Sequence, residues 1–284
     1  MKLERGLSEN TVISYKNDLK KLAIWCDERD LMPLKLNSKN IKDYLYFLHE
    51  EGITARSQSR ALSTLRSLYK YLLLEDWIQT DPTELLESPK IGRQLPDVLS
   101  EDDIDRIIAA IDLSKPEGER NRAMLEVLYG CGLRVSELIN LQISNLRLKE
   151  GFVIVTGKGN KQRLVPINEQ AIKFLKIYKD QVRVLQPIKG EHQDILFLNR
   201  RGAKLSRVMI FTIIKNLTEK AGIKKKVSPH TFRHSFASHM VNRGANLRVV
   251  QEMLGHESIT TTEIYTHLND TKLRETIEKF HPRS

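Results

Sequence analysis

Residues 152–167 read FVIVTGKGNKQRLVPI and decide the fold class, because they form a hairpin pattern in a chain that otherwise favours helices. Phe152–Val155 is an apolar, β-branched run typical of a strand, and Gln162–Ile167 is a second such run. The GKGN stretch between them indicates a turn, since glycine tolerates the positive φ angles that tight hairpins require. The sequence therefore predicts a small β-sheet with Lys158 at the tip of its hairpin.

Helical patterns flank the hairpin on both sides. Upstream, Ser100 is placed to cap a helix, with acidic residues directly after it. Apolar residues at helical spacing then predict helices at about 120–130, from 135, and at 169–184, 206–221, 229–243, 247–254, 260–268 and 271–280. The segment 99–284 is predicted to be a mixed α/β domain, mainly α with a small β-sheet.

The N-terminal part of the chain contains helical patterns alone. Helices are expected from the Ser8–Thr11 cap to Cys26, at 38–50 and at 55–74, with a short fourth opening at Asp81. The stretch ESPKIGRQLPD at 87–97 has two prolines and a glycine and lacks apolar periodicity, which is typical of a linker. We expect an N-terminal helical bundle at 1–88, a linker at 89–98 and the second domain at 99–284.

The expected helix at 55–74 has two contrasting faces. Its apolar residues share one side, and small polar and basic residues form a narrow stripe on the other. That stripe comprises Arg56, Arg60, Ser63, Ser67 and Lys70. Such a face is either an ordinary solvated surface or a surface that approaches phosphates closely, because serines are small and arginines pair with phosphate.

The net charge of +10 is distributed unevenly along the chain. Residues 1–90 hold 14 basic and 14 acidic side chains, whereas residues 151–284 hold 24 basic and 11 acidic ones. An excess of this size favours a polyanion such as nucleic acid, although solubility alone is the plainer interpretation. The basic clusters expected to contact phosphates are Arg200, Arg201, Lys204, Lys224, Lys225 and Lys226.

Several classes of protein are disfavoured by what the sequence lacks. Two cysteines are too few for a disulfide framework or a structural zinc site. The glycines around Lys158 do not extend to a Walker loop, and His230 is not followed by the glutamate of an H-E-x-x-H metal motif. We expect no cofactor and no metal. An apolar leader and a membrane-length apolar run are also absent, so a cytoplasmic location is expected.

Six polar residues stand out by their local settings. Arg134 follows a glycine turn, Lys158 lies at the hairpin tip, and His230 and Arg233 share a helical face at i, i+3 spacing. His256 follows a helix-ending glycine, and Tyr265 lies nine residues later. Taken singly, each is more often a surface charge, a helix cap or a core tyrosine than a functional group.

Taken together and in order, these residues resemble the tyrosine recombinase family, most closely its Xer branch. The likeness is carried by GLRVSEL at 132–138, VTGKGNKQRLVPI at 155–167, SPHTFRHSFASHM at 228–240 and LGHESITTTEIYTH at 254–267. The N-terminal LSENTVISYKNDLKKL at 7–22 resembles the start of the SAM-like core-binding domain of that branch. The resemblance covers essentially the whole chain and implies a DNA strand transferase that needs neither metal nor ATP.

The resemblance also implies a role for each matching residue. Arg134 and Arg233 match two catalytic arginines that clamp the phosphate, and His256 matches a histidine that adds a hydrogen bond. Tyr265 matches the nucleophile, His230 the proton acceptor and Lys158 the acid that protonates the leaving oxygen. Glu137 matches an acidic supporting position.

The implied architecture is a two-domain clamp on a double-stranded recombination site. Four identical or paralogous chains would exchange strands through a Holliday junction, docking through the C-terminal helix at about 271–280, and an accessory activator is conceivable. The implied task is resolution of chromosome or plasmid dimers by a cytoplasmic, nucleoid-associated enzyme. An integrase of a mobile element and a catalytically silent DNA-binding protein of the same fold remain open alternatives.

Overall fold

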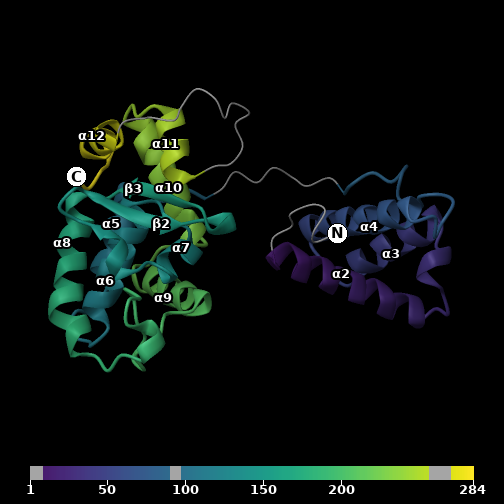
Figure 1. Cartoon of the computed structure of the whole chain (residues 1–284), viewed down its shortest axis with the longest axis horizontal. Helices are drawn as coiled ribbons and strands as arrows, with labels where there is room; N and C mark the ends of the chain where they lie inside the picture. The colour runs from purple at the N-terminus through teal and green to yellow at the C-terminus, as the bar shows by residue number, and fades with distance from the viewer. Residues whose placement is uncertain (1–8, 90–96, 256–269) are drawn as a thin grey trace. The chain divides into compact units, whose positions relative to one another are not determined.

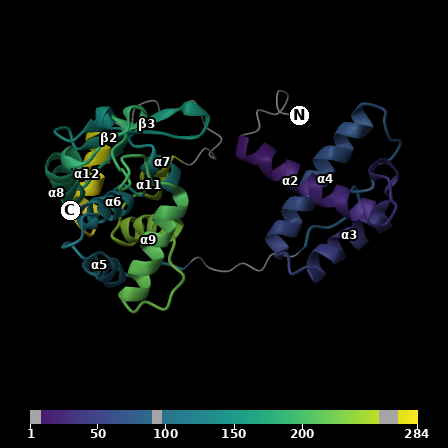
Figure 2. The ribbon, with the colours of Figure 1, turned by 90° about the horizontal axis from the view of Figure 1, so that it is seen from below.

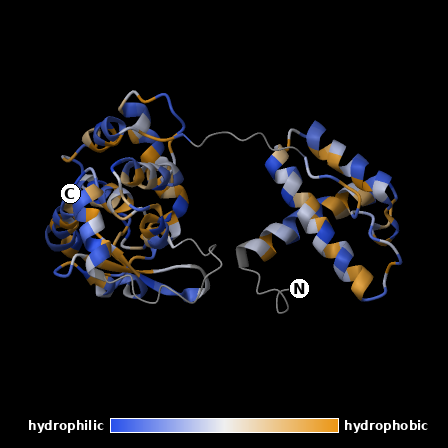
Figure 3. Cartoon of the chain, turned by 90° about the horizontal axis from the view of Figure 1, so that it is seen from above, coloured by the Kyte–Doolittle hydropathy of each residue, from blue (hydrophilic) through white to orange (hydrophobic). Residues whose placement is uncertain are grey.

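The computed structural model describes residues 9–89, 97–255 and 270–284. The chain divides into two compact units, Met1–Gln94 and Leu95–Ser284, each with its own core (Figure 1). Figure 3 shows hydrophobic and hydrophilic residues alternating along the helices of both units, as expected for helices that pack by one face. The chain is thus mainly helical with a small sheet, as predicted.

The described residues of the first unit, 9–89, form three long helices and a short 3-10 helix. Their bounds are α2 Glu9–Asp27, η1 Pro33–Lys35, α3 Ser38–Glu50 and α4 Ala55–Leu74. Asn37 and Thr54 cap α3 and α4 through their side chains. The prediction of a fourth helix opening at Asp81 is wrong, because the chain forms a turn there. The Asp81 carboxylate accepts hydrogen bonds from the backbone N–H and the hydroxyl of Thr83 and stabilises this turn.

The second unit surrounds a three-stranded antiparallel sheet of order β1-β2-β3 with helices (Figure 1). The strands are β1 Leu146–Arg147, β2 Phe152–Thr156 and β3 Gln162–Pro166, with Val155 opposite Arg163. The α-helices are α5 Glu101–Ala109, α6 Gly118–Gly130, α7 Val135–Ile139, α8 Glu169–Ile177, α9 Arg207–Lys220, α10 Pro229–Asn242, α11 Leu247–Leu254 and α12 Asp270–Phe280. The described part of this unit also has four 3-10 helices and one π-helix: η2 Ile143–Asn145, η3 Lys158–Asn160, η5 Arg183–Leu185 and η6 Gly190–His192 are 3-10 helices, and η4 Tyr178–Val182 is the π-helix.

Leu99, just beyond the predicted linker, is fixed to α10 through its backbone. Its N–H donates to the hydroxyl of Ser235 at 2.9 Å, and its carbonyl accepts from Nε2 of His239 at 2.8 Å. Nδ1 of His239 then accepts from the hydroxyl of Tyr129 at 2.7 Å, so the neutral ring uses both nitrogens. Burial lowers the pKa of His239, which agrees with that neutral state. The start of the second unit is therefore fastened to the middle of α10.

The C-terminal helix packs within its own unit. Leu273 and Ile277 are 5% and 1% exposed, and α12 contacts β3, α10 and α11. Figure 2 shows α12 within the second unit, near the sheet. Beyond it, the Arg283 guanidinium pairs with the fully buried carboxylate of Glu126, with Nη2 2.7 Å from Oε1. The C-terminal helix expected to dock on a neighbouring chain thus has its apolar face covered by its own unit.

Candidate active site

Arg134 follows a glycine turn that sets its position at the start of α7. Gly132 has φ +58°, and a Cβ there would come within 2.5 Å of the Phe236 ring, so only glycine fits the turn after α6. Arg134 then caps α7, and its backbone N–H donates to Oε2 of Glu137 at 2.8 Å. Its Nη1 donates to Oε1 of the same carboxylate at 2.9 Å, which fixes the side chain.

The Glu137 carboxylate is the centre of a cationic cluster. Its side chain is 2% exposed and lies among Arg134, Arg163 and Arg233. Burial alone would raise the pKa of Glu137, but hydrogen bonds from Arg163 and Arg134 outweigh burial and lower the pKa below its ordinary value. The carboxylate is therefore ionised at neutral pH, and it partly neutralises three converging guanidiniums.

Arg233 approaches the cluster from α10. Its side chain is 8% exposed, and Nη1 donates to the Gly132 carbonyl at 2.8 Å and lies 3.8 Å from Oε2 of Glu137. Burial and the nearby Arg134 lower the pKa of Arg233 to about 10. It remains charged at neutral pH, so two guanidiniums from α7 and α10 meet at one place.

His230 lies one turn before Arg233 on the same helix and is exposed. Partial burial and the neighbouring His234, Arg233 and Arg134 lower its pKa below 6.5. At neutral pH the ring is uncharged, and a neutral imidazole beside a cationic clamp can accept a proton.

Three consecutive backbone carbonyls at the C-terminal end of α11 each accept a hydrogen bond from a different arginine. Arg163 Nε donates to Met253, Arg233 Nη2 to Leu254 and Arg134 Nη2 to Gly255, at 3.2, 2.5 and 3.0 Å. Gly255 ends the helix with φ +64°, the left-handed conformation common at helix ends. The residue that follows is His256, so the cluster fixes the point from which the His256 segment leaves.

The structure brings together four of the seven residues expected in the site: Arg134, Glu137, His230 and Arg233. The Lys158 backbone lies in η3 at the tip of the β2–β3 hairpin, as predicted. His256 and Tyr265 lie outside the described residues, so their predicted positions in the site stay predictions.

Arg163 was missed by the analysis of single motifs. In an antiparallel pair, opposite residues share a face, and Arg163 lies opposite the buried Val155. A cation on the inner face of a sheet needs an acidic partner, so the hairpin register in the sequence was the signal that could have found it.

The residues predicted to contact DNA are surface groups, several of which have protein partners. Arg56, Arg60, Ser63 and Lys70 are exposed on α4 and Ser67 is half-buried, but Arg60 also forms a two-point pair with the buried Asp18. In the second unit all six predicted basic residues are exposed. Arg200 pairs with Glu117, Lys204 donates to Asn140, and Lys225 pairs with Asp103. Arg201, Lys224 and Lys226 have no such contact among the interactions of the described chain.

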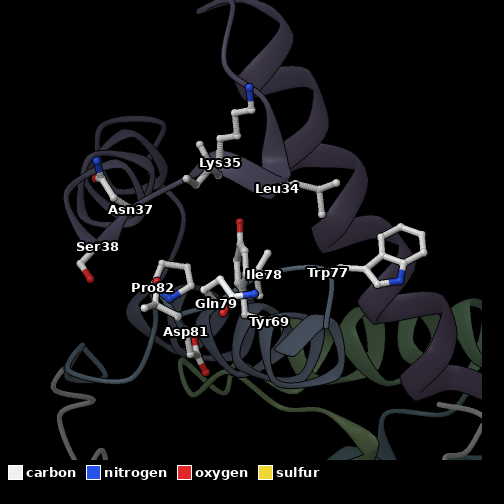
Figure 4. Close-up of a pocket in the computed structure, with 12 residues that line it drawn as sticks. Leu34, Lys35, Asn37, Ser38, Tyr69, Trp77, Ile78, Gln79, Asp81 and Pro82 are labelled. Atoms are coloured by element: carbon white, nitrogen blue, oxygen red, sulfur yellow. The ribbon is translucent and has the colours of Figure 1, made fainter. Parts of the chain in front are cut away.

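A pocket of about 390 Å³ lies in the first unit (Figure 4). It is lined by η1 and the 77–82 segment, with Trp77 at its edge and the Tyr69 hydroxyl donating to the Pro33 carbonyl. Its acidic residue, Asp81, is already bonded to Thr83. The pocket offers none of the predicted chemistry.

Comparison with known proteins settles the family. The phage integrase family model matches residues 97–272, and the model of the phage integrase N-terminal SAM-like domain matches residues 1–76. The chain belongs to the phage integrase family. It is 42% identical to tyrosine recombinase XerD of Oceanobacillus iheyensis, over 100% of this chain and 96% of that protein. It is 43% identical to XerD of Staphylococcus aureus strain Mu50, with the same coverage of both chains.

Solved structures of the family share the fold. The crystal structure of XerA recombinase is 33% identical, with a TM-score of 0.53 over 98% of this chain and 94% of that one. XerH bound to a palindromic difH substrate has a TM-score of 0.76 at 23% identity, over 95% of this chain and 80% of that one. The predicted resemblance to tyrosine recombinases of the Xer branch and the predicted fold class are confirmed. In the described part of the chain, no helix has both the length and the apolar character needed to cross a bilayer.

Proposed function

We propose that this integrase-family member is a site-specific tyrosine recombinase that cuts and rejoins DNA through a covalent bond to Tyr265. The observation that carries the proposal is the convergence of Arg134 and Arg233 around the buried Glu137, with the uncharged His230 beside them. This is a preorganised anion site adjoined by a proton acceptor, which is what attack on a phosphodiester requires.

The two arginines supply the electrostatic part of the reaction. Attack on phosphorus gathers negative charge on the non-bridging oxygens, and planar guanidiniums meet that charge with paired donors. Glu137 and the α11 carbonyls hold both guanidiniums before DNA arrives, so little reorganisation is needed. In this proposal, His256 adds a further hydrogen bond to the same oxygens.

Proton movement completes the reaction. A phenol has a pKa near 10, so His230 accepts the Tyr265 proton as the oxygen attacks. The Tyr265 oxygen bonds to phosphorus, the bond to the 5′-oxygen breaks, and Lys158 protonates that leaving oxygen. The phosphotyrosyl ester keeps the energy of the broken bond, and a 5′-hydroxyl of the partner strand attacks it in the reverse sense, without ATP.

The substrate in this proposal is a double-stranded recombination site. The similarity to proteins named XerD favours resolution of chromosome or plasmid dimers over integration of a mobile element. We propose that the helical domain at 1–88 and the catalytic domain at 99–284 are joined by the 89–98 linker and grip the duplex from two sides. The exposed α4 stripe and the basic residues Arg201, Lys224 and Lys226 would contact phosphates.

Assembly extends the proposal to four chains on two duplexes. The apolar face of α12 is buried in its own unit, so docking on a neighbour would exchange this helix between equivalent grooves. The partner chain is identical or paralogous, an accessory activator would act at this exchange, and the assembly would work at the nucleoid.

A nicked suicide substrate tests the proposal. Its cut strand loses the 5′-hydroxyl needed for religation, so a tyrosine recombinase accumulates as a covalent protein–DNA adduct visible on a denaturing gel. We expect the adduct with the wild-type chain and none with Tyr265→Phe. A wild-type chain that binds the site without forming the adduct is a silent DNA-binding protein, and an adduct with Tyr265→Phe would remove Tyr265 as the nucleophile.

A further inference from the structure

Arg163 joins three of the elements that surround the site. It lies on β3, in the hairpin whose tip bears Lys158, and it binds both Glu137 on α7 and the Met253 carbonyl on α11. One rigid, planar group therefore sets the distances among the hairpin, α7 and the end of α11.

The hydrogen bonds at Glu137 show why Arg163 matters to Arg134. Oε1 accepts from Nη1 of Arg134 and from Nη1 of Arg163, while Oε2 accepts from the Arg134 backbone N–H and from Nη2 of Arg163. Each oxygen thus accepts two bonds, which fixes the plane of the carboxylate. Without Arg163, each oxygen of Glu137 keeps only its hydrogen bond from Arg134. The carboxylate can then rotate, and the Arg134 guanidinium rotates with it.

Gly255 provides an independent sign of the same arrangement. A Cβ at this position would come within 3.0 Å of both Cζ and Nε of Arg163. The guanidinium therefore lies close against the backbone turn that precedes His256. Its side chain is only 19% exposed, so water competes weakly for its donors.

We propose that Arg163 is a positioning residue of the strand-transfer site, which orients Arg134 through Glu137 and fixes the turn that leads into His256. The inference rests on the proposed function. It assigns to Arg163 no contact with DNA and no proton transfer; its effect passes through the groups it holds.

The test compares Arg163→Gln and Arg163→Lys with the control Arg147→Gln, which replaces an exposed arginine on β1, the far strand of the same sheet. We measure the single-turnover rate of adduct formation on a suicide substrate at saturating DNA, and separately the Kd for the uncut site. Arg163→Gln should slow cleavage by about 10- to 100-fold, since small misplacements of catalytic groups have effects of this size. The Kd and the Arg147→Gln rate should stay within about twofold of wild type.

Arg163→Lys keeps the charge beside Glu137 but lacks the planar fork, so its rate should fall between wild type and Arg163→Gln. If Arg163→Gln does not fold, Arg163→Lys decides: slower cleavage at unchanged Kd supports the inference, and a wild-type rate overturns it. A rise in Kd by the same factor as the fall in rate also overturns the inference, because Arg163 would then bind DNA.

A double-mutant cycle locates the path of the effect. In a Glu137→Gln background, Arg163→Gln should add little further loss, because the group it orients is already altered. If the double variant instead loses rate by the product of the two single losses, Arg163 does not act through Glu137. A wild-type chain that forms no adduct instead refutes the proposed function itself, which keeps the two failures apart.

Discussion

Glu137 shows how a single buried acid organises a cationic site. Three guanidiniums within reach of one carboxylate would repel one another strongly without it. The carboxylate is nearly inaccessible to water, so the attraction is screened little, and removing one partner of such a pair typically destabilises a protein by about 3–5 kcal/mol. The same group that stabilises the fold thus leaves the site with an excess of positive charge suited to a phosphate.

The pH dependence of cleavage should report the lowered pKa of His230. Below that pKa the ring is protonated and cannot accept the Tyr265 proton, so the rate falls as the pH falls through it. We expect the acid limb of the single-turnover rate to have its midpoint below pH 6.5. Burial is the largest cause of the shift and His234 is the next, so His234→Gln should move the midpoint upward.

The matched control for this profile is His192→Gln, since His192 belongs to η6 and has no part in the cluster. It should leave the acid limb where it is in the wild-type chain. A wild-type midpoint at or above 6.5 would contradict His230 as an uncharged proton acceptor.

At the scale of elements, α12 is held by its own unit through Ile277. Replacing a fully buried isoleucine with alanine removes contacts and leaves a cavity, which typically lowers the free energy of unfolding by about 2–5 kcal/mol. We expect Ile277→Ala to lower the urea midpoint of the second unit, followed by circular dichroism, while the exposed Lys272→Ala has little effect.

The two tryptophans give an internal control for this measurement. Trp25 and Trp77 both lie in the first unit, so tryptophan fluorescence follows that unit alone. The fluorescence transition should be the same in wild type and Ile277→Ala. An unchanged circular dichroism transition in Ile277→Ala would mean that α12 does not contribute to the stability of the free chain.

Much of the element order could be predicted from the sequence, since local signals decide it. The β2–β3 hairpin follows from its glycine turn. The helix α11 at 247–254 has the predicted bounds because Asn246 caps its start and Gly255 ends it. The predicted helix at 169–184 instead changes to a π turn at Tyr178–Val182. Next to it, the Arg183 guanidinium donates to the carbonyls of Gln193, Ile195 and Leu196, a contact that local periodicity cannot reveal.

The candidate site was predictable only in part, for the same physical reason. Arg134, His230 and Arg233 stand in motifs that their near neighbours define. Arg163 becomes recognisable only when β3 has been paired with β2 and laid against α7, which is a tertiary fact.

At the scale of the whole molecule, the positive charge is concentrated in residues 151–284. DNA affinity should therefore fall steeply with salt, in proportion to the phosphates neutralised. Replacing both Lys224 and Lys226 with alanine should reduce the slope of log Kd against log salt by up to about 2, by the counterion-release relation. Fluorescence anisotropy of a labelled recombination site over a salt series measures this slope.

Lys225 is the matched control within the same run of three. Its ammonium lies 2.7 Å from Asp103 and also donates to the Val98 carbonyl, so its charge is already compensated within the protein. Lys225→Ala should change the slope of log Kd against log salt less than Lys224→Ala or Lys226→Ala does alone. A change as large as theirs would show that DNA displaces Asp103.

The attachment of Leu99 to α10 has a mechanical consequence. Both backbone groups of Leu99 are held by Ser235 and His239, and the same helix carries His230 and Arg233 in its first two turns. A pull on the chain just before Leu99 would therefore act on α10, the helix that carries two of the residues proposed to act on the phosphate. If the two units grip a duplex as proposed, the bonds of Leu99 to Ser235 and His239 link the connecting segment to the catalytic helix, so the fit of the duplex would influence the rate of cleavage.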